Sequence, residues 1–431
     1  MGERSRERSG RSPGRLRVAL LTYRGNPRSG GQGVYVRRLS RALADLGHEV
    51  EVLSGPPYPE LEPGEGVRLT RLPSLDLYRA EAPFRPQRPI RGPIDLLEFG
   101  IMCSAGFPEP LTFSLRAWAE LRRRRRSVDV VHDNQCLGYG LLGIAASGPP
   151  VLATIHHPIQ VDRRLELARA PRSRRTSLRR WYGFARMQAR VARRLAHVIT
   201  VSAAARDDIV REMGVRRERI TVVPNGVDAD LFRPLPDRPR RPGRVVSMAG
   251  LDAPIKGLEP LLRAFARLRS RRPAELVVVG RPRPDGPAAR LLDELQLNGS
   301  VRFLGGLSDR ALVELYASAE AAVVPSLYEG FSLPALEAMA CGVPLVASRA
   351  GGLPEVTGAD GETALLVPPD DPDALAAALL TVLSDPGLGR RLGARGRERA
   401  TRHFSWEAAA RATVDVYRAV LTRVPGDGAA C

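Results

Sequence analysis

Residues 16–22 read LRVALLT, residues 30–33 read GGQG, and an amphipathic run follows from Val34 to Leu46. A short, mostly apolar run is typical of a buried strand, and the amphipathic run is typical of a helix. The unit is therefore a strand, a glycine-rich loop and a helix. Further strand patterns lie at residues 48–53, 128–132, 151–155 and 198–201, and a helical pattern lies at residues 137–146. This alternation predicts a parallel sheet covered by helices.

A second series of the same kind follows a stretch rich in proline and arginine, residues 233–243. Its strand patterns lie at residues 244–248, 275–279, 301–303, 321–324 and 344–347, and helical patterns lie at residues 258–270 and 309–317. The length of 431 residues also exceeds the roughly 250 to 300 at which one core usually stops growing. We therefore expect an α/β protein with a disordered tail (1–14), a first Rossmann-like domain (15–232), a linker (233–243), a second Rossmann-like domain (244–403) and a last helix (404–424) that packs back on the first domain. Residues 56–126 show no sustained periodicity, and we expect their arginine run, residues 122–126, to be a solvated helix end.

The charge is strongly basic, with 66 basic against 47 acidic residues, and Lys256 is the only lysine of the chain. Between residues 161 and 197 there are twelve arginines against Asp162 and Glu166, so this stretch alone carries 12 minus 2, or +10, of the total +19. Aromatic residues lie among these arginines. Two interpretations stay open: a cationic surface for an anionic membrane, or a solvated helix at the edge of a domain. No nucleic-acid-binding module is recognisable, so no nucleic acid is expected as a partner.

The four cysteines, at positions 103, 136, 341 and 431, are scattered and form no metal-binding or disulfide pattern. The apolar stretch at residues 137–155 is broken by Gly148 and two prolines, and the N-terminus lacks the apolar core of a signal peptide. We therefore expect a protein of the reducing cytoplasm without a membrane span.

Residues 326–344 read SLYEGFSLPALEAMACGVP and follow a predicted buried strand. Glu329 and Gly330 form a loop, Pro334 suits the first helical position, and Glu337 is expected in the first turn of the helix. The backbone N–H groups at the start of a helix, together with the helix dipole, favour an anion such as a diphosphate. Two carboxylates therefore flank a predicted anion site.

The Glu329-x7-Glu337 pattern in this segment resembles the signature of the retaining glycosyltransferase family four, also called glycosyl transferases group 1. Four other segments add to the resemblance: the GGQG loop at residues 30–33, VVPNGVD at residues 222–228, GGLPEV at residues 351–356 and FSW at residues 404–406. The resemblance covers roughly residues 16–420. It implies the GT-B fold, in which two Rossmann-like domains face each other across a cleft. It also implies that the first domain binds the acceptor and the second a nucleotide sugar.

The resemblance also implies roles for particular residues. Glu329 would orient the hydroxyls of the donor sugar, and Glu337 would bind the ribose. The backbone of Gly330, Phe331, Ser332 and Leu333 is expected on the sugar and diphosphate, and the glycines Gly30, Gly31 and Gly33 would let the first domain approach that diphosphate closely.

A basic pair of the family is only half present here. Lys256, followed by Gly257, matches the phosphate-binding lysine, whereas the position six residues earlier, where the family has arginine, is Gly250. Arg281 is one candidate substitute for the missing arginine. Residues 154–158 read TIHHP. In this segment His156 matches the family's histidine at the reacting sugar slightly better than His157 does, and the choice between the two stays open.

The resemblance implies transfer of a hexosyl unit from a nucleotide-diphosphate sugar to an acceptor hydroxyl, of a lipid, a cell-envelope glycan or a small molecule, with retention at the anomeric carbon. No cofactor and no metal is required, although Asp228 and Asp230 resemble the Asp-x-Asp metal motif of other glycosyltransferases. Two alternatives remain: a nucleotide-sugar epimerase of the same fold, and a sugar-nucleotide binding protein weakened by the absence of arginine at Gly250.

Overall fold

The computed structural model describes residues 14–26, 31–62, 64–78, 84–124, 128–248, 254–280 and 286–423. Gly30, Gly250 and Arg281, together with residues 1–13 of the expected tail, lie outside the described residues.

Among its described residues, the first half of the chain builds a parallel sheet of seven strands in the order β3-β2-β1-β4-β5-β6-β7. The strands are β1 (Arg17–Thr22), β2 (Glu49–Ser54), β3 (Val67–Arg71), β4 (Val130–Asn134), β5 (Val151–Ile155), β6 (His197–Thr200) and β7 (Ile220–Val222). Val18 of β1 pairs with Val50 of β2 on one side and with Val130 of β4 on the other, so β1 is an interior strand of the sheet. The helices of this half are α1 (Gly31–Asp45), α2 (Pro93–Cys103), α3 (Glu109–Arg124), α4 (Gly140–Ala146), α5 (Ile159–Arg169), α6 (Arg172–Trp181), α7 (Ala185–Ala192) and α8 (Ala203–Asp208).

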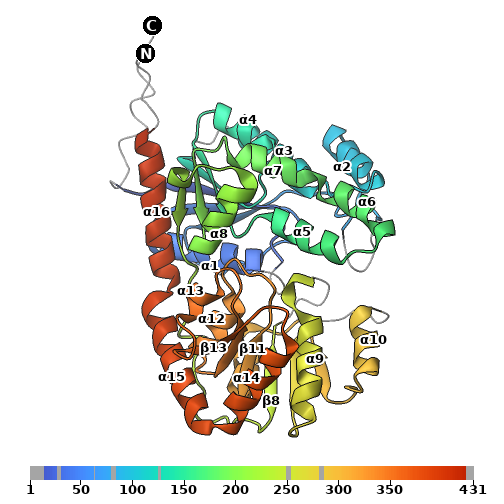
Figure 1. Ribbon diagram of the computed structural model, residues 1–431. Helices are drawn as coiled ribbons and strands as arrows, with labels where there is room; N and C mark the ends of the chain where they lie inside the picture. The colour runs from blue at the N-terminus through green and yellow to red at the C-terminus, as the bar shows by residue number, and fades with distance from the viewer. Residues whose placement is uncertain are drawn as a thin grey trace, which may run out of the picture.

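The described part of the second half builds a parallel sheet of six strands in the order β10-β9-β8-β11-β12-β13. The strands are β8 (Arg244–Ser247), β9 (Glu275–Val279), β10 (Val301–Leu304), β11 (Ala321–Val324), β12 (Leu345–Ser348) and β13 (Ala364–Val367). The helices are α9 (Leu258–Arg269), α10 (Pro287–Glu294), α11 (Asp309–Ala317), α12 (Leu333–Ala340), α13 (Leu353–Thr357), α14 (Pro372–Ser384), α15 (Pro386–His403) and α16 (Trp406–Arg423). Short 3-10 or π turns are η1 (Tyr182–Phe184), η2 (Ile209–Met213), η3 (Arg217–Arg219) and η4 (Pro254–Lys256). The predicted fold class, two helix-covered parallel sheets, is confirmed (Figure 1).

The last helix returns to the first half of the chain. After α15, which lies along the second half, α16 continues along the first half (Figure 1). Trp406, Ala410 and Tyr417 of α16 belong to the same buried cluster as Leu20 of β1 and Leu39 of α1. The C-terminal segment therefore closes the outer face of the first sheet.

Within residues 56–126, the part that the structure describes contains β3, α2 and α3, which the sequence pattern did not predict. Both α2 and the edge strand β3 carry polar and exposed positions, so their periodicity is weak. The helix predicted over residues 137–146 begins only at Gly140. The arginine run starts in the last turn of α3, where Arg122 and Arg123 are exposed as expected, and residues 125–127 lie outside the described part.

Candidate active site at the junction of the two halves

Three of the predicted site residues follow the carboxyl ends of parallel strands. His156 comes directly after β5, Glu329 follows β11, and Lys256 lies in η4 after β8. In open parallel sheets the ligand site lies outside these strand ends, at the place where the strand order reverses. In the second sheet that place lies between the neighbouring strands β8 and β11. The fold therefore brings Lys256 and Glu329 together, and they meet His156 at the junction of the two halves.

Lys256 and Glu329 form an ion pair at this junction. The Nζ atom of Lys256 lies 2.8 Å from Oε1 of Glu329, and the hydroxyl of Ser326 donates to the same oxygen over 2.8 Å. The Glu329 side chain is 11% exposed and that of Lys256 is 35% exposed. The second carboxylate oxygen of Glu329 is thus left for other donors, and the ammonium is reachable from solvent.

The loop at Gly330 has no space for a side chain. A Cβ atom built at Gly330 would lie 2.1 Å from the backbone oxygen of His156 in the other half of the chain. On the loop's other side, a Cβ at Gly351 would lie 2.0 Å from the backbone oxygen of Glu329. The hydroxyl of Ser202, at the start of α8, donates to the Gly330 carbonyl over 2.5 Å. Gly330 therefore permits the direct contact between the two halves, and Gly351 permits the close packing of the same loop within the second half.

Two helices begin facing each other beside this loop. The first residue of α1, Gly31, lies next to Leu333, since a Cβ at Gly31 would be 3.9 Å from a Leu333 methyl group. Ser332 caps α12 from a left-handed conformation (φ 87°), and its hydroxyl accepts from the Ala335 N–H. Phe331, Ser332 and Leu333 therefore lie where predicted, at a helix start that favours an anion. Gly33 is equally restricted, because its Cβ would lie 1.9 Å from the Asn26 oxygen.

Two details of the predicted helix were wrong. The helix begins at Leu333, one residue before Pro334, so the proline is the second helical residue. Glu337 consequently lies in the second turn rather than in the first. The cap formed by Ser332 explains the earlier start, because a capping hydroxyl accepts from a backbone amide of the first turn.

Glu337 is buried, and its Oε2 atom has no hydrogen-bond partner among the described residues. Burial, reinforced by the carboxylate of Asp309, raises the pKa of Glu337 to about 7, although Arg38 and Arg37 oppose the shift. A buried carboxylate oxygen without a partner is costly unless a ligand supplies a donor. This arrangement suits the hydroxyl group of a ligand.

The two adjacent histidines differ in environment. The Nε2 atom of His156 is 2.8 Å from Oδ1 of Asn134, and burial, with the neighbouring His157, lowers the pKa of His156 to about 3. Burial would also lower the pKa of His157, but the Asp162 carboxylate, 2.7 Å from Nε2, outweighs it and raises the pKa. The charge of Lys256 also lowers the pKa of His157, and that of Glu329 raises it. His156 is thus a neutral group, and His157 is the histidine electrostatically coupled to the ion pair.

Two arginines that the sequence did not point out cross the junction from α1. Arg37 lies 2.7 Å from Asp309 of α11, and Arg38 lies 3.3 Å from the same carboxylate. Arg38 also pairs with Asp228 at 2.9 Å. Asp309 is 272 residues from Arg37 and 271 from Arg38, and Asp228 is 190 residues from Arg38, so only the folded arrangement reveals these pairs. They place positive charge beside Glu337.

Asp228, the first residue of the Asp-x-Asp motif, stabilises a turn through its side chain. Its carboxylate pairs with Arg38 and accepts from the N–H groups of Asp230 and Leu231. In the part of the chain that the structure describes, no group of three or more His, Cys, Asp or Glu side chains could hold a metal ion.

The family follows from comparison with known proteins. The family model for "Glycosyltransferase Family 4" matches residues 29–231, and the model for "Glycosyl transferases group 1" matches residues 242–385. The chain belongs to this glycosyltransferase family and is a hexosyltransferase of GT-B fold.

Particular relatives are similar over nearly the whole length. An "MMP alpha-(1->4)-mannosyltransferase" of Mycolicibacterium hassiacum is 54% identical over 95% of this chain and 99% of its own. A "D-inositol 3-phosphate glycosyltransferase 2" of Catenulispora acidiphila is 32% identical over 93% of this chain and 94% of its own. Among solved structures, a sucrose-phosphate synthase of Thermosynechococcus elongatus superimposes with a TM-score of 0.73 at 27% identity, over 95% of this chain and all of that one.

Proposed function

We propose that the protein transfers a mannosyl residue from a nucleotide-diphosphate sugar to a hydroxyl group of a glycan acceptor, forming an α-(1→4) linkage with retention at the anomeric carbon. The observation that carries the proposal is the Lys256–Glu329 ion pair, which lies beside the start of α12 and opposite His156. The choice of mannose and of the linkage is supported by the name of the relative that shares 54% of its residues.

The donor is assigned to the second half of the chain. Its diphosphate would lie between the starts of α1 and α12, within reach of the Lys256 ammonium. Glu329 would accept hydrogen bonds from sugar hydroxyls through its Oε2 atom, since Lys256 and Ser326 both contact Oε1. Glu337 would accept a hydrogen bond from the ribose, since its buried Oε2 has no partner among the described side chains. The acceptor is assigned to the first half, on the side of His156. No metal ion or other cofactor is included.

In the proposed reaction, the acceptor oxygen forms a bond to the anomeric carbon while the bond from that carbon to the diphosphate oxygen breaks. Both events take place on the same face of the sugar. The proton of the acceptor hydroxyl passes to the departing phosphate oxygen. The protein supplies no nucleophile; Lys256 and the helix starts stabilise the negative charge that develops on the leaving group.

Donor specificity and turnover separate this function from its alternatives. The purified protein is incubated with mannose and glucose donors linked to GDP, UDP or ADP, with and without an oligomannoside acceptor. A transferase releases nucleoside diphosphate and forms a glycoside only with acceptor present. An epimerase converts the donor sugar into its epimer without an acceptor. A binding protein has a higher melting temperature with one of the donors present but converts none of them.

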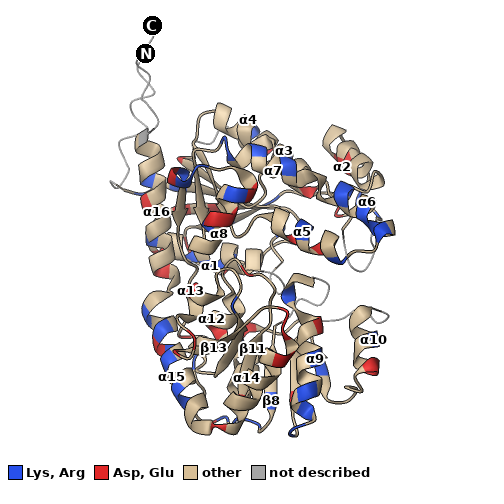
Figure 2. Cartoon of the chain, in the orientation of Figure 1, with Lys and Arg blue, Asp and Glu red and all other residues tan. Residues whose placement is uncertain are grey.

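We also propose that the protein works at the cytoplasmic face of an anionic membrane. Among the described residues, six of the seven exposed large hydrophobic side chains lie at or near α2: Tyr78, Phe84, Ile90, Leu96, Leu97 and Phe99. The ring of Trp181, at the end of the arginine-rich α6, lies 5.2 Å from that of Tyr78 between ring centroids. Trp181 also packs against the buried cluster that contains Met102 of α2, which joins the two helices. Figure 2 shows basic residues on α6 beside the mostly uncharged α2. Apolar side chains next to arginines suit a lipid interface. No helix of the described residues is long and apolar enough to span a membrane.

Sedimentation with vesicles tests this association. Leu97→Ser, on α2, should reduce binding to vesicles that contain phosphatidylglycerol. Tyr139→Ser is the matched control, because Leu97 and Tyr139 are both 39% exposed and Tyr139 lies outside α2. Equal binding by wild type and both variants would contradict the proposed surface.

A further inference from the structure

An arginine-lined hollow of about 680 Å³ lies in the first half of the chain, away from the ion pair of the active site. It is bounded by α5, α6, α7 and the π turn η2. Its lining residues are Gln160, Arg163, Arg164, Leu167, Ala168, Arg175, Arg179, Ala185, Arg186, Ala189 and Glu212. Small-ligand sites commonly have volumes between about 300 and 1,000 Å³. The hollow is therefore large enough for a small molecule.

The charges around the hollow are unbalanced. Five lining residues are arginines and one is a glutamate, so the net charge is 5 minus 1, or +4. Glu212 pairs with Arg164. In the part of the chain that the structure describes, the other four, Arg163, Arg175, Arg179 and Arg186, pair with no carboxylate. Gathered guanidinium groups repel one another unless an anion lies between them. The hollow therefore lacks counter-charge of its own.

The hollow also has an apolar part and polar atoms without hydrogen-bond partners among the described residues. Leu167, Ala168, Ala185 and Ala189 contribute aliphatic surface. Gln160 donates its amide to the Ala185 carbonyl, yet its Oε1 atom has no partner among the described residues. The buried Nε atom of Arg163 is likewise without a partner there. A ligand that fits would combine several negative charges with an apolar part.

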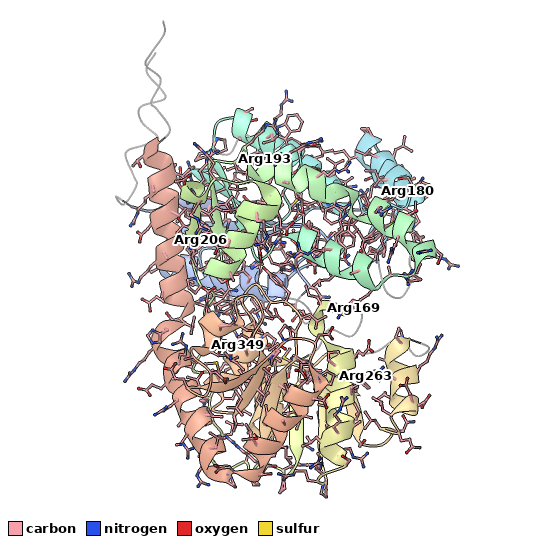
Figure 3. All side chains as sticks on the ribbon, viewed as in Figure 1. Arg169, Arg180, Arg193, Arg206, Arg263 and Arg349 are labelled. Carbon is pink, nitrogen blue, oxygen red and sulfur yellow. The ribbon has the colours of Figure 1, made fainter. Side chains whose placement is uncertain are left out.

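The hollow and the active site use opposite faces of α5. Gln160, Arg163, Arg164 and Leu167 recur at spacings of three and four residues, so they lie on one face of the helix. Asp162 and Arg169 lie on the opposite face, where Asp162 holds His157 at 2.7 Å and Arg169 pairs with Asp370 of the second half at 2.7 Å. Figure 3 shows Arg169 at the junction and Arg180 at the outer end of α6. A ligand in the hollow would thus be one helix away from the site.

We propose that this hollow is a binding site for a multiply phosphorylated ligand, distinct from the donor site. Guanidinium groups bind phosphate oxygens through paired, charge-assisted hydrogen bonds, and four arginines without carboxylate partners match two or more phosphate groups. The phosphates can belong to a free small molecule or to a lipid headgroup, and both sources present the same chemistry to the arginines.

The test uses the full-length protein and two double variants. Arg179→Gln with Arg186→Gln removes two lining arginines, one from α6 and one from α7. Arg180→Gln with Arg190→Gln is the matched control, because it removes the same charge from the same two helices at positions that do not line the hollow. Lys256→Ala marks the donor site. Binding of inorganic tripolyphosphate is measured by calorimetry, and binding of vesicles containing phosphatidylinositol phosphate by sedimentation.

We expect the Arg179/Arg186 variant to bind tripolyphosphate at least tenfold more weakly, whereas the control and Lys256→Ala stay within about twofold of wild type. The same pattern with vesicles alone would assign the site to a lipid headgroup. Equal weakening in both double variants would overturn the proposal, since only diffuse surface charge would then be involved. Loss of tripolyphosphate binding in Lys256→Ala alone, or no binding by wild type in either assay, would overturn it as well.

Discussion

Replacement of Lys256 tests whether its ammonium stabilises the leaving diphosphate. At an effective dielectric constant near 20, a charge about 4 Å from a phosphate oxygen contributes roughly 4 kcal/mol. The Lys256 side chain is 35% exposed, so solvent screening reduces this value. We therefore expect Lys256→Ala to lower kcat/KM by about 10- to 100-fold, or about 1.4 to 2.7 kcal/mol of transition-state stabilisation.

Initial rates of nucleoside diphosphate release, measured with the donor that the wild type prefers, give this value. Arg263→Ala is the control, because the Arg263 side chain on α9 is 37% exposed and also pairs with a glutamate, Glu259, at 3.1 Å, away from the junction (Figure 3). Lys256→Arg should keep the charge but lose rate, since the planar guanidinium approaches an oxygen differently from a compact ammonium. Melting temperatures report whether the variants remain folded. Rates within twofold of wild type for both Lys256 variants would refute the role given to this lysine.

Three further predictions concern the junction. Gly330→Ala should lower both kcat/KM and the melting temperature, because its Cβ would lie 2.1 Å from the His156 oxygen, whereas Gly183→Ala, with no atom within 4 Å, should change neither; equal behaviour of the two variants would argue against the close contact. Glu337→Gln should weaken donor binding measured by calorimetry. The same variant should raise the free energy of unfolding at pH 8 by up to about 3 kcal/mol, because a carboxyl whose folded pKa is raised to about 7 costs stability as the pH rises from the unfolded pKa through the folded one. A variant less stable than wild type at pH 8 would contradict the burial argument. Asp162→Asn should lower the melting temperature more at pH 6 than at pH 9. The raised pKa of His157 makes the His157–Asp162 pair stabilising at low pH, and this contribution is lost as the pH rises through that pKa. An equal loss at both pH values would contradict the charge coupling between the two side chains.

The sequence predicted most strands of both sheets because buried parallel strands are short apolar runs. β13 was missed, since its residues ALLV lie in a region rich in alanine and leucine that also fits a helix. β3 was missed because its residues VRLTR lie at the sheet edge, where polar positions weaken the pattern. Pattern alone therefore predicts the central strands better than the edges.

The residues of the site also fall into those that local motifs predicted and those that only the folded arrangement reveals. Glu329, Lys256 and the loop at Gly330 were predicted, since each belongs to a local motif, and the structure brings them together. Arg37, Arg38 and Asp309 were not, because their pairing depends on how the two halves are placed. The importance of Asp162 for His157 also lay outside the motifs, although the five-residue spacing at the start of a helix was available as a signal.

The stereochemistry of the product tests whether the protein is a retaining transferase that depends on Glu329. The donor with an α-linked sugar is incubated with an oligomannoside acceptor, and the anomeric proton and carbon signals of the new linkage are followed by NMR before any equilibration. We expect an α-linked product from the wild type and none above background from Glu329→Ala, whose melting temperature should stay close to that of the wild type. A β-linked product, or undiminished transfer by Glu329→Ala, would contradict this assignment.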